Sequence, residues 1–459
     1  MTKLIEQPAE KPSAPSLKQA FWYWLKLGFI SFGGPAGQIA IMHQDLVENK
    51  RWISEKRFLH ALNYCMLLPG PEAQQLATYI GWLMHRTRGG IIAGGLFVLP
   101  SLLILIALSF VYMRFGDVPA VAAVLAGIKP AVVAIVLFAA YRIGTRTLVN
   151  PTLWGIACAS FIAITFFKLP FPWIVLAAAV IGFLVNRYQP ALFAGGAGHK
   201  ASQKNYGRAV IDDDTPTPAH AIFNFKTLSK FVGFGIAMWL AVMLVLVLRY
   251  GWDATFTQMG WFFTKAALLT FGGAYAVLPY VYQGAVTHYG WLTPTQMMDG
   301  LALGETTPGP LIMVVAFVGF VGGWSNAALA DPLAAGIAAA CVVTFFTFLP
   351  SFIFIFVGAP FIESTKNNLK FTAPLTAITA AVVGVIVSLA VFFAQHLLWP
   401  LGLTWTSARG LFDALLANIH APSGVAILIA CILLFKFKLS VIKLIGIFAL
   451  AGLLFQLFS

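Results

Sequence analysis

Residues 26–71 read KLGFISFGGPAGQIAIMHQDLVENKRWISEKRFLHALNYCMLLPGP, and residues 265–310 read KAALLTFGGAYAVLPYVYQGAVTHYGWLTPTQMMDGLALGETTPGP, in the same register and without a gap. Eleven of the 46 aligned positions are identical. Six of the eleven identities fall on glycine, proline and one lysine inside otherwise apolar segments, and only one each falls on leucine and valine. The main pairs are Phe32-Gly33-Gly34 with Phe271-Gly272-Gly273, and Pro69-Gly70-Pro71 with Pro308-Gly309-Pro310. A repeat of this kind is typical of a membrane transporter with two pseudo-symmetric halves.

The composition indicates a polytopic membrane protein. Of 459 residues, 59% are hydrophobic and 10% are charged, and the mean hydropathy is +0.85. A soluble protein of this length needs more polar surface. The formal net charge of +13 does not indicate a nucleic-acid partner, because the basic residues stand at segment ends and in loops. Membrane topology and anionic lipid head groups account for them there.

A bilayer core requires about 20 apolar residues per helix, and on that measure the chain holds about 13 transmembrane segments in an all-α fold. We divide it into a cytoplasmic tail (1–20), a first repeat (21–187), a cytoplasmic linker (188–230), and an extra helix followed by the second repeat (231–459). The segments of the first half are 21–42, 58–84, 89–113, 119–142, 152–167 and 171–186. Those of the second half are 231–249, 256–283, 295–321, 333–358, 374–396, 422–435 and 440–458.

The two repeats are predicted to be inverted relative to each other, because seven crossings precede the second copy. With the N-terminus inside, most basic loops then lie inside, as the positive-inside rule requires. The loop Asp45–Arg57 is the exception, because it carries four basic residues and is placed outside. Either this charge has a functional reason, or segment 21–42 is a re-entrant hairpin and the count of crossings is shifted.

Lys26 and Lys265 occupy the same place in the two copies. A lysine at the centre of a membrane helix costs about 2.5–3.5 kcal/mol, so one that lies there usually faces a cavity or a partner. The alternative is that the side chains extend to the head groups. Their duplication favours a function, and we expect Lys26→Ala or Lys265→Ala to abolish transport.

The glycine pairs and Pro-Gly-Pro motifs predict broken helices in mid-membrane. A half-helix that starts after a break presents free N–H groups and the positive end of its dipole. The alternative is that these residues only kink the helices or let them pack closely. Neutral hydrogen-bonding groups near the breaks are Ser31, Gln74, Gln75, Thr270, Thr306 and Thr307.

Lysines, half-helix N-termini and neutral donors together favour an anion as ligand, and Arg51 beside Trp52 could attract it electrostatically. Glu72 and Glu305 are candidates for proton coupling, although either could instead form a salt bridge that only stabilises the fold. His60 and Asp299 are aligned near segment starts and are weaker candidates. No HExxH, GxSxG or Walker motif is present, so neither enzyme chemistry, a metal, a cofactor nor coupling to ATP is expected.

Phe32–Pro35, Arg51–Ser54 with Phe58, and the Leu-Pro-Gly-Pro-Glu-Ala-Gln-Gln of residues 68–75 resemble the hallmarks of the chromate transporter family over almost the whole chain. The resemblance implies a long-chain member with two homologous halves. It also implies a bacterial inner-membrane protein that exports chromate, driven by the membrane potential or a proton gradient, and confers chromate resistance. Ala274 and Gly290 depart from the pattern, so the second block is expected to serve structure more than ligand contact.

The predicted substrate-binding set joins the residues that the resemblance carries over to those chosen from the repeat. Its members are Lys26, Ser31, Phe32, Gly33, Gly34, Arg51, Trp52, Pro69, Gly70, Pro71, Gln75, Lys265, Thr270, Gly272, Gly273, Pro308, Gly309 and Pro310. The expected partners are chromate, with sulfate as the alternative, and membrane lipids, and a homodimer stays open. Uptake or exchange of another oxyanion, a passive anion channel and a membrane scaffold are the competing functions.

Overall fold

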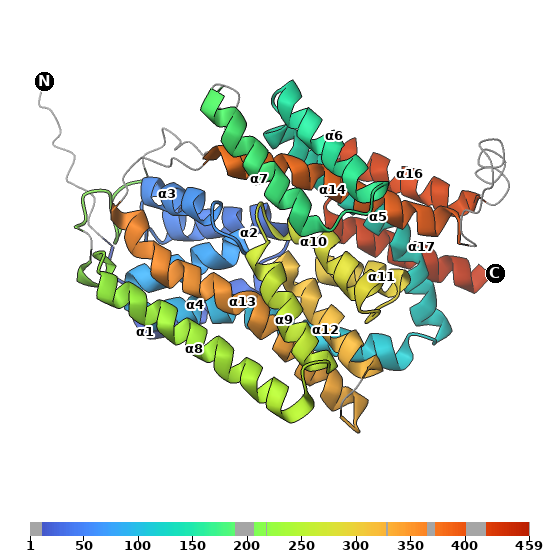
Figure 1. Ribbon diagram of the computed structural model, residues 1–459, viewed down its shortest axis with the longest axis horizontal. Helices are drawn as coiled ribbons and strands as arrows, with labels where there is room; N and C mark the ends of the chain where they lie inside the picture. Colours follow the sequence, from blue (N-terminus) through green and yellow to red (C-terminus); the bar gives the residue numbers. More distant parts are fainter. Residues whose placement is uncertain are drawn as a thin grey trace, which may run out of the picture.

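The computed structural model describes residues 12–188, 206–216, 218–326, 329–364, 372–400 and 419–458. Within these ranges the regular elements are helices, and one isolated bridge joins Ile53 to Ile211 (Figure 1). The first copy contains α1 (Leu17–Ile30), α2 (Gly34–His43), the π-helix η1 (Gln44–Asn49), α3 (Glu55–Cys65), α4 (Glu72–Phe115), α5 (Pro119–Thr147), α6 (Pro151–Thr165) and α7 (Phe171–Tyr188).

The second copy has the same order of elements, preceded by η3 (Ala219–Ala221) and the additional helix α8 (Phe225–Tyr250). It contains α9 (Thr255–Leu268), α10 (Ala274–Tyr282), the π-helix η4 (Gln283–His288), α11 (Pro294–Thr306), η5 (Leu311–Met313), α12 (Val314–Ser325), α13 (Pro332–Ser364), α14 (Thr372–Leu398), α16 (Ala421–Phe435) and α17 (Val441–Phe458). Even the helix starts agree, because Ser54 and Thr293 occupy equivalent positions and cap α3 and α11 with their hydroxyls.

Segment 21–42 does not cross the membrane but folds back at its break. The ring of Tyr23 on α1 lies 5.1 Å from that of Trp52, which follows α2 and η1 in the chain. About 21 Å of α1 therefore enters, and α2 with η1 returns to the same face. In the second copy α9 and α10 do the same, since the Tyr289 hydroxyl donates to Gln258 Oε1 at 3.3 Å. We call α1–α2 the first hairpin and α9–α10 the third hairpin.

The Pro-Gly-Pro segments turn back as well. The helix drawn as α4 is two helices, because its backbone is non-helical at His85 and Arg86. Its first limb returns to the face where α3 began, so that Tyr79 of α4 and Arg57 of α3 both bond to Glu363. In the second copy α11 and α12 run antiparallel in the same way. We call α3 with the first limb of α4 the second hairpin, and α11–α12 the fourth hairpin.

The two copies are inverted relative to each other. Leu99-Pro100-Ser101 of α4 recurs as Leu349-Pro350-Ser351 of α13, which makes these helices equivalent. Gly90 and Gly94 of α4 pack against Phe356 and Phe352 of α13, respectively, so residue numbers rise along one helix and fall along the other. Equivalent helices that run antiparallel place one copy upside down relative to the other, which confirms the predicted inversion.

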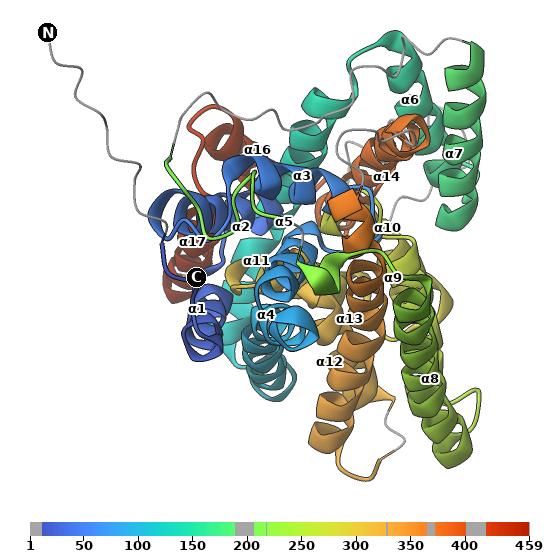
Figure 2. The same ribbon diagram turned by 90° about the vertical axis from the view of Figure 1, so that its left-hand side faces the viewer.

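The last three helices of each copy are interlocked. α6 and α7 pack against α14 of the other copy, and α16 and α17 pack against α5 (Figures 1 and 2). The closest approaches are symmetric, because Gly182 of α7 meets Ala373 and Ala377 while Gly452 of α17 meets Ala123 and Gly127. The two copies therefore share one bundle, which we call the interlocked bundle (α5, α6, α7, α14, α16 and α17).

The loop Asp45–Arg57 lies on the same face as the linker, so its predicted position on the opposite face is wrong. The N–H of Val210 donates to the Arg51 carbonyl at 2.9 Å, and that of Ile211 donates to the Trp52 carbonyl at 3.0 Å. The Ser54 hydroxyl donates to Asp213 Oδ1 at 2.6 Å. The physical reason is that the first hairpin returns without crossing, which is the re-entrant alternative that the sequence left open for segment 21–42. We call this face the linker side and the opposite face the far side.

The all-α polytopic class, the inverted halves and the broken helices are confirmed. In the described part of the chain, seven helices are long and apolar enough to cross a membrane (α4, α5, α7, α8, α13, α14 and α17), and α6 and α16 are shorter apolar helices. The four broken segments 21–42, 58–84, 256–283 and 295–321 form the hairpins. The hairpins add no crossing. The crossings between the start of the first copy and the start of the second are therefore the second limb of α4 and the helices α5, α6, α7 and α8, and this odd number is consistent with inversion.

Candidate functional site

The four breaks have a left-handed backbone at glycine. Gly33, Gly34, Gly272 and Gly273 have φ of 89°, 68°, 79° and 93°. Gly70 and Gly309 have φ of 131° and 98°. L-residues with a Cβ rarely adopt these values, so the glycines allow the chain to end one half-helix and begin another within the membrane.

The tips of the hairpins meet in symmetric pairs. The N–H of Gly70 donates to the carbonyl of Thr270 at 2.8 Å, and the N–H of Gly309 donates to the carbonyl of Ser31 at 2.8 Å. Each Pro-Gly-Pro motif thus binds the residue that precedes the Phe-Gly-Gly motif of the other copy. A buried backbone N–H needs such a partner, and these two bonds bring all four breaks together.

Several buried side-chain oxygens at the tips have no hydrogen-bond partner within the described ranges. They are Ser31 Oγ, Gln38 Oε1, Gln75 Oε1 and Ser101 Oγ. The amide nitrogens of the two glutamines are bonded, since Gln38 donates to the carbonyls of Ser31 and Gly309, and Gln75 donates to the carbonyl of Pro69. Unpaired buried oxygens are costly, so the tips suit a polar ligand or water. Thr270, Thr306 and Thr307, by contrast, donate to backbone carbonyls three or four residues earlier in the chain.

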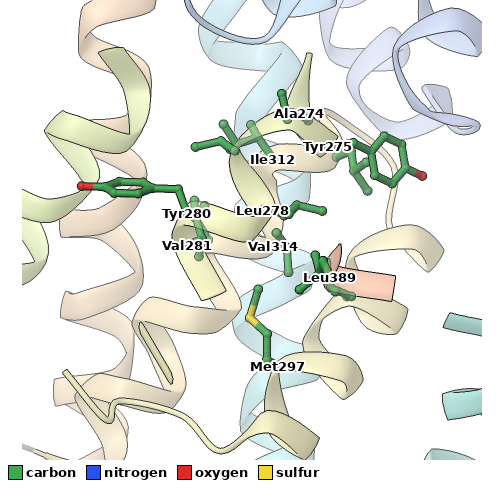
Figure 3. Packing of buried hydrophobic residues seen from close by; sticks show 14 of the residues in the cluster. Ala274, Tyr275, Leu278, Tyr280, Val281, Met297, Ile312, Val314 and Leu389 are labelled. Carbon is green, nitrogen blue, oxygen red and sulfur yellow. The ribbon is translucent and has the colours of Figure 1, made fainter. Parts of the chain in front are cut away.

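The half-helices that follow the two glycine pairs differ in burial. In α10, eight of nine residues are buried, whereas in α2 only Gln38 and Met42 of ten residues are buried. α10 packs against α14 and α7, and α11 packs against α5 and α17. Figure 3 shows Leu278 and Val281 of α10 among Ile312, Val314 and Leu389.

The equivalent surfaces of the first copy are uncovered. α2 makes at most marginal contact with α5 and α17, as does α3 with α14 and α7. Gly33, Ala36 and Ala40, at helical spacing on one side of α2, are exposed. The hairpins of the first copy are therefore separated from the interlocked bundle near the linker side, while those of the second copy seal the far side against it.

An ion pair strengthens the sealed interface. Lys129 of α5 lies 3.8 Å from Asp299 of α11, and the Tyr112 hydroxyl donates to the same carboxylate at 3.0 Å. The equivalent residues of the first copy do not pair: His60 bonds to the Ile362 carbonyl at 2.9 Å, and Thr379 donates to the Leu375 carbonyl at 2.8 Å. Asp299 therefore joins a hairpin to the interlocked bundle on the far side only.

Charged residues approach the breaks of both copies: Arg142 lies at the first break, and Glu72 and Glu305 lie at the third. Nη2 of Arg142 on α5 lies 4.0 Å from the position that a Cβ on Gly34 would occupy, and Oε1 of Glu72 lies 3.7 Å from that of a Cβ on Gly273. Glu305 accepts a hydrogen bond from the Tyr275 hydroxyl at 2.5 Å. The positive charge of Arg142 acts on both Glu72 and Glu305. Arg142 is the last residue of the predicted segment 119–142 and is not among the predicted site residues.

The structure does not bring the two duplicated lysines to the breaks. α1 buries Tyr23, Trp24 and Leu27 against α4, and Lys26 is exposed on its opposite side. Lys265 is half-buried, and its Nζ lies 5.4 Å from the ring centre of Trp261, beside α8. The difference from the prediction has a simple cause: each lysine stands on the side of its helix that faces away from the other hairpins.

Arg51 and Trp52 lie at the linker-side end of the first hairpin, away from the breaks. Arg51 has a φ of 51° where the second copy has Gly290 with a φ of 63°, and its guanidinium packs against Gly207. Trp52 is buried against Tyr23. Of the other predicted residues, Gly70, Pro71, Pro308, Gly309 and Pro310 are buried at the tips, while Phe32 and Pro69 are half-buried.

Inverted halves, re-entrant broken hairpins and a shared bundle define a polytopic membrane protein with the architecture of a secondary transporter. The family model described as chromate transporter matches residues 18–183 and 257–453. The chain belongs to the chromate transporter family.

Three bacterial relatives match over most of the chain. The chromate transport protein of Cupriavidus metallidurans is 30% identical, over 92% of this chain and 89% of that protein. The chromate transport protein of Pseudomonas aeruginosa is 33% identical (84% and 82%), and the probable chromate transport protein of Synechococcus elongatus is 30% identical (90% and 96%). No solved structure matches the chain.

Proposed function

We propose that this protein is a secondary active transporter that exports chromate across the bacterial inner membrane and so confers chromate resistance. The observation that carries the proposal is the difference between the two inverted copies, one separated from the interlocked bundle and the other packed against it. Exchange of these two arrangements would expose the tips alternately to the two sides of the membrane. The printed names of the relatives support chromate as the substrate.

In this proposal the linker side is cytoplasmic, and so is the N-terminus. The loop Asp45–Arg57 now lies on the same side as the basic residues Arg187, Lys226 and Lys230. The one exception to the positive-inside rule therefore disappears. The first copy is then open toward the cytoplasm, where an exporter collects its substrate.

The membrane potential is sufficient as a driving force. Moving two negative charges outward across 100 mV, inside negative, yields about 4.6 kcal/mol. At 1.4 kcal/mol per factor of ten, this sustains roughly a 10³-fold concentration ratio without further coupling. A proton gradient is the alternative, with Glu72 and Glu305 as the carriers.

Uptake of radiolabelled chromate into energised everted membrane vesicles tests the proposal. The interior of such vesicles is positive, so we expect chromate to accumulate, and valinomycin with potassium to abolish accumulation if the potential drives it. Loss with nigericin instead would assign the driving force to the proton gradient. Vesicles that accumulate no more chromate than those without the protein would refute chromate export. Accumulation of sulfate in place of chromate would assign another oxyanion.

A further inference from the structure

Arg142 has no counterpart in the second copy, where Phe392 takes its place, and it has no ionic partner among the described residues. Phe392, on α14, packs on Tyr282 and His396. Among the described residues, the guanidinium of Arg142 forms neither a hydrogen bond nor an ion pair within 4.0 Å. A guanidinium that lies within a membrane protein without a partner is costly and usually marks a functional site.

Extension of Arg142 to the head groups does not explain its position. α5 ends at Thr147, and the exposed Arg146 already occupies the end of the helix. The guanidinium of Arg142 instead approaches Gly34, the first residue of α2. This residue lies at the tip of the first hairpin, about 24 Å from the linker-side loop along α2 and η1.

The surroundings of Arg142 suit a dianion. α2 begins with no side-chain cap, so its first free N–H groups and the positive end of its dipole face the same break. The buried Ser31 Oγ, one residue before Phe-Gly-Gly, has no hydrogen-bond partner in the part of the chain that the structure describes. Guanidinium, free N–H groups and a hydroxyl are the donors that tetrahedral oxyanions bind in proteins.

Two carboxyl groups limit the net charge of this site. Oε1 of Glu72 lies 3.7 Å from the position of a Cβ on Gly273, and Glu305 accepts a hydrogen bond from Tyr275, so both carboxyl groups lie at the tips that Arg142 approaches. When both carboxyl groups are ionised, their two negative charges exceed the single positive charge of Arg142. A dianion that binds Arg142 must then compete with these carboxylates.

We propose that Arg142, at the break of the first copy, is the cation that coordinates the transported tetrahedral dianion, and that Glu72 and Glu305 compete with the dianion for it. The proposal rests on the proposed function for the identity of the dianion. It assigns the ligand to the uncovered copy and to a side chain that is not duplicated, in place of the paired lysines.

The test compares KM and maximal rate for chromate uptake at alkaline pH, where the carboxyl groups are ionised. We expect Arg142→Gln to raise KM at least tenfold, as loss of a charge-assisted bidentate contact does, and Arg142→Lys to recover part of the loss. Glu72→Gln should lower KM, because it removes a competitor. Arg187→Gln, the same charge change at an exposed site on α7, is the matched control and should leave KM unchanged.

The expected changes in KM are opposite for Arg142→Gln and Glu72→Gln, and this difference distinguishes ligand binding from a structural role of Arg142. If Arg142 only stabilised the fold by pairing with Glu72, Arg142→Gln and Glu72→Gln would both lower the amount of active protein and leave KM unchanged. That result would overturn the proposal. If the wild-type protein accumulates no chromate, the proposed function fails. The inference is then decided by titrating purified protein with chromate and with sulfate: binding lost in Arg142→Gln supports it, and binding equal in both proteins overturns it.

Discussion

α2 and α10 occupy equivalent positions in the two copies, yet eight of nine residues are buried in α10 and only two of ten in α2. The sequences that form them share the same glycine pair, and their tips make the same reciprocal hydrogen bonds. The difference therefore arises not at the breaks but in how each hairpin packs against the interlocked bundle. One chain thus displays both a separated and a packed form of the same unit.

This comparison teaches which part of the molecule is fixed. The tips are held together by two backbone hydrogen bonds that are identical in length, 2.8 Å. The hairpin-to-bundle interfaces, by contrast, are packed on the far side and open on the linker side. A transporter that alternates would keep the hydrogen bonds between the tips. Its hairpin-to-bundle interface would open on one side of the membrane while the equivalent interface closed on the other.

The largest expected effect comes from breaking the fixed part. In Gly309→Ala, a Cβ would lie 2.8 Å from Ser101 Cβ, on a backbone with a φ of 98°. Positive φ costs about 1–2 kcal/mol and overpacking about 1–3 kcal/mol, so we expect loss of most folded protein. In Gly70→Ala the nearest atom is the flexible Gln75 Nε2 at 2.6 Å, and the loss should be smaller.

Thermal unfolding of the detergent-purified variants, followed by fluorescence-detected size exclusion, measures this difference. Gly309→Ala should have the lower midpoint, with Gly70→Ala between it and the wild type. Wild-type stability of Gly309→Ala would show that the tips are not a tight, fixed contact.

A smaller effect is expected from loosening the sealed interface. Asp299→Asn leaves the Lys129 ammonium, 3.8 Å away, without its charged partner. Breaking a buried pair in this way costs about 3 kcal/mol, so the fourth hairpin should separate from α5 more often. Alkylation of Leu278→Cys from the far side, in a background without the four native cysteines, should then become faster.

Replacing both partners with apolar residues, as in Lys129→Met with Asp299→Leu, is the control for this prediction. Because no charge is left unpaired, the double variant should be alkylated more slowly than the single one. Equal alkylation rates in the wild type and in Asp299→Asn would show that the pair does not hold the far side closed.

The smallest effect is expected for the duplicated lysines. Lys26 is exposed and Lys265 lies over Trp261, so Lys26→Ala should change chromate uptake less than twofold, the size of a typical surface substitution. Lys265→Ala should reduce it more, through lost contact with Trp261 at the junction with α8. If Lys26→Ala abolished uptake, ligand binding would have to be assigned to the lysines, and the position of α1 in the structure would be contradicted.

The repeat, the breaks and the inversion could be predicted because they depend on local features: glycine, proline and apolar run length. Whether a segment crosses could not be predicted, because α1 with 14 residues turns back whereas α6, with 15 residues and therefore almost the same length, belongs to the bundle. The return is decided by distant contacts such as Tyr23 with Trp52.

The candidate site was predicted in part for the same reason. The glycine and proline tips lie together as expected, because glycine and proline themselves indicate where the backbone can break. The direction of Lys26 depends on which side of α1 packs against α4, and the position of Arg142 depends on how α5 meets a hairpin a hundred residues away. Neither follows from spacing along one segment.

The exchange of the two packing states is tested most directly by a matched cysteine pair at Ile39 and Leu278, which are equivalent positions on α2 and α10. Ile39 is partly exposed and Leu278 is 0% exposed. In proteoliposomes, Ile39→Cys should be alkylated from the linker side at rest, and Leu278→Cys should not react. During chromate turnover we expect Leu278→Cys to become reactive from the far side while Ile39→Cys becomes slower. Rates at both positions that stay the same with and without turnover would contradict the account.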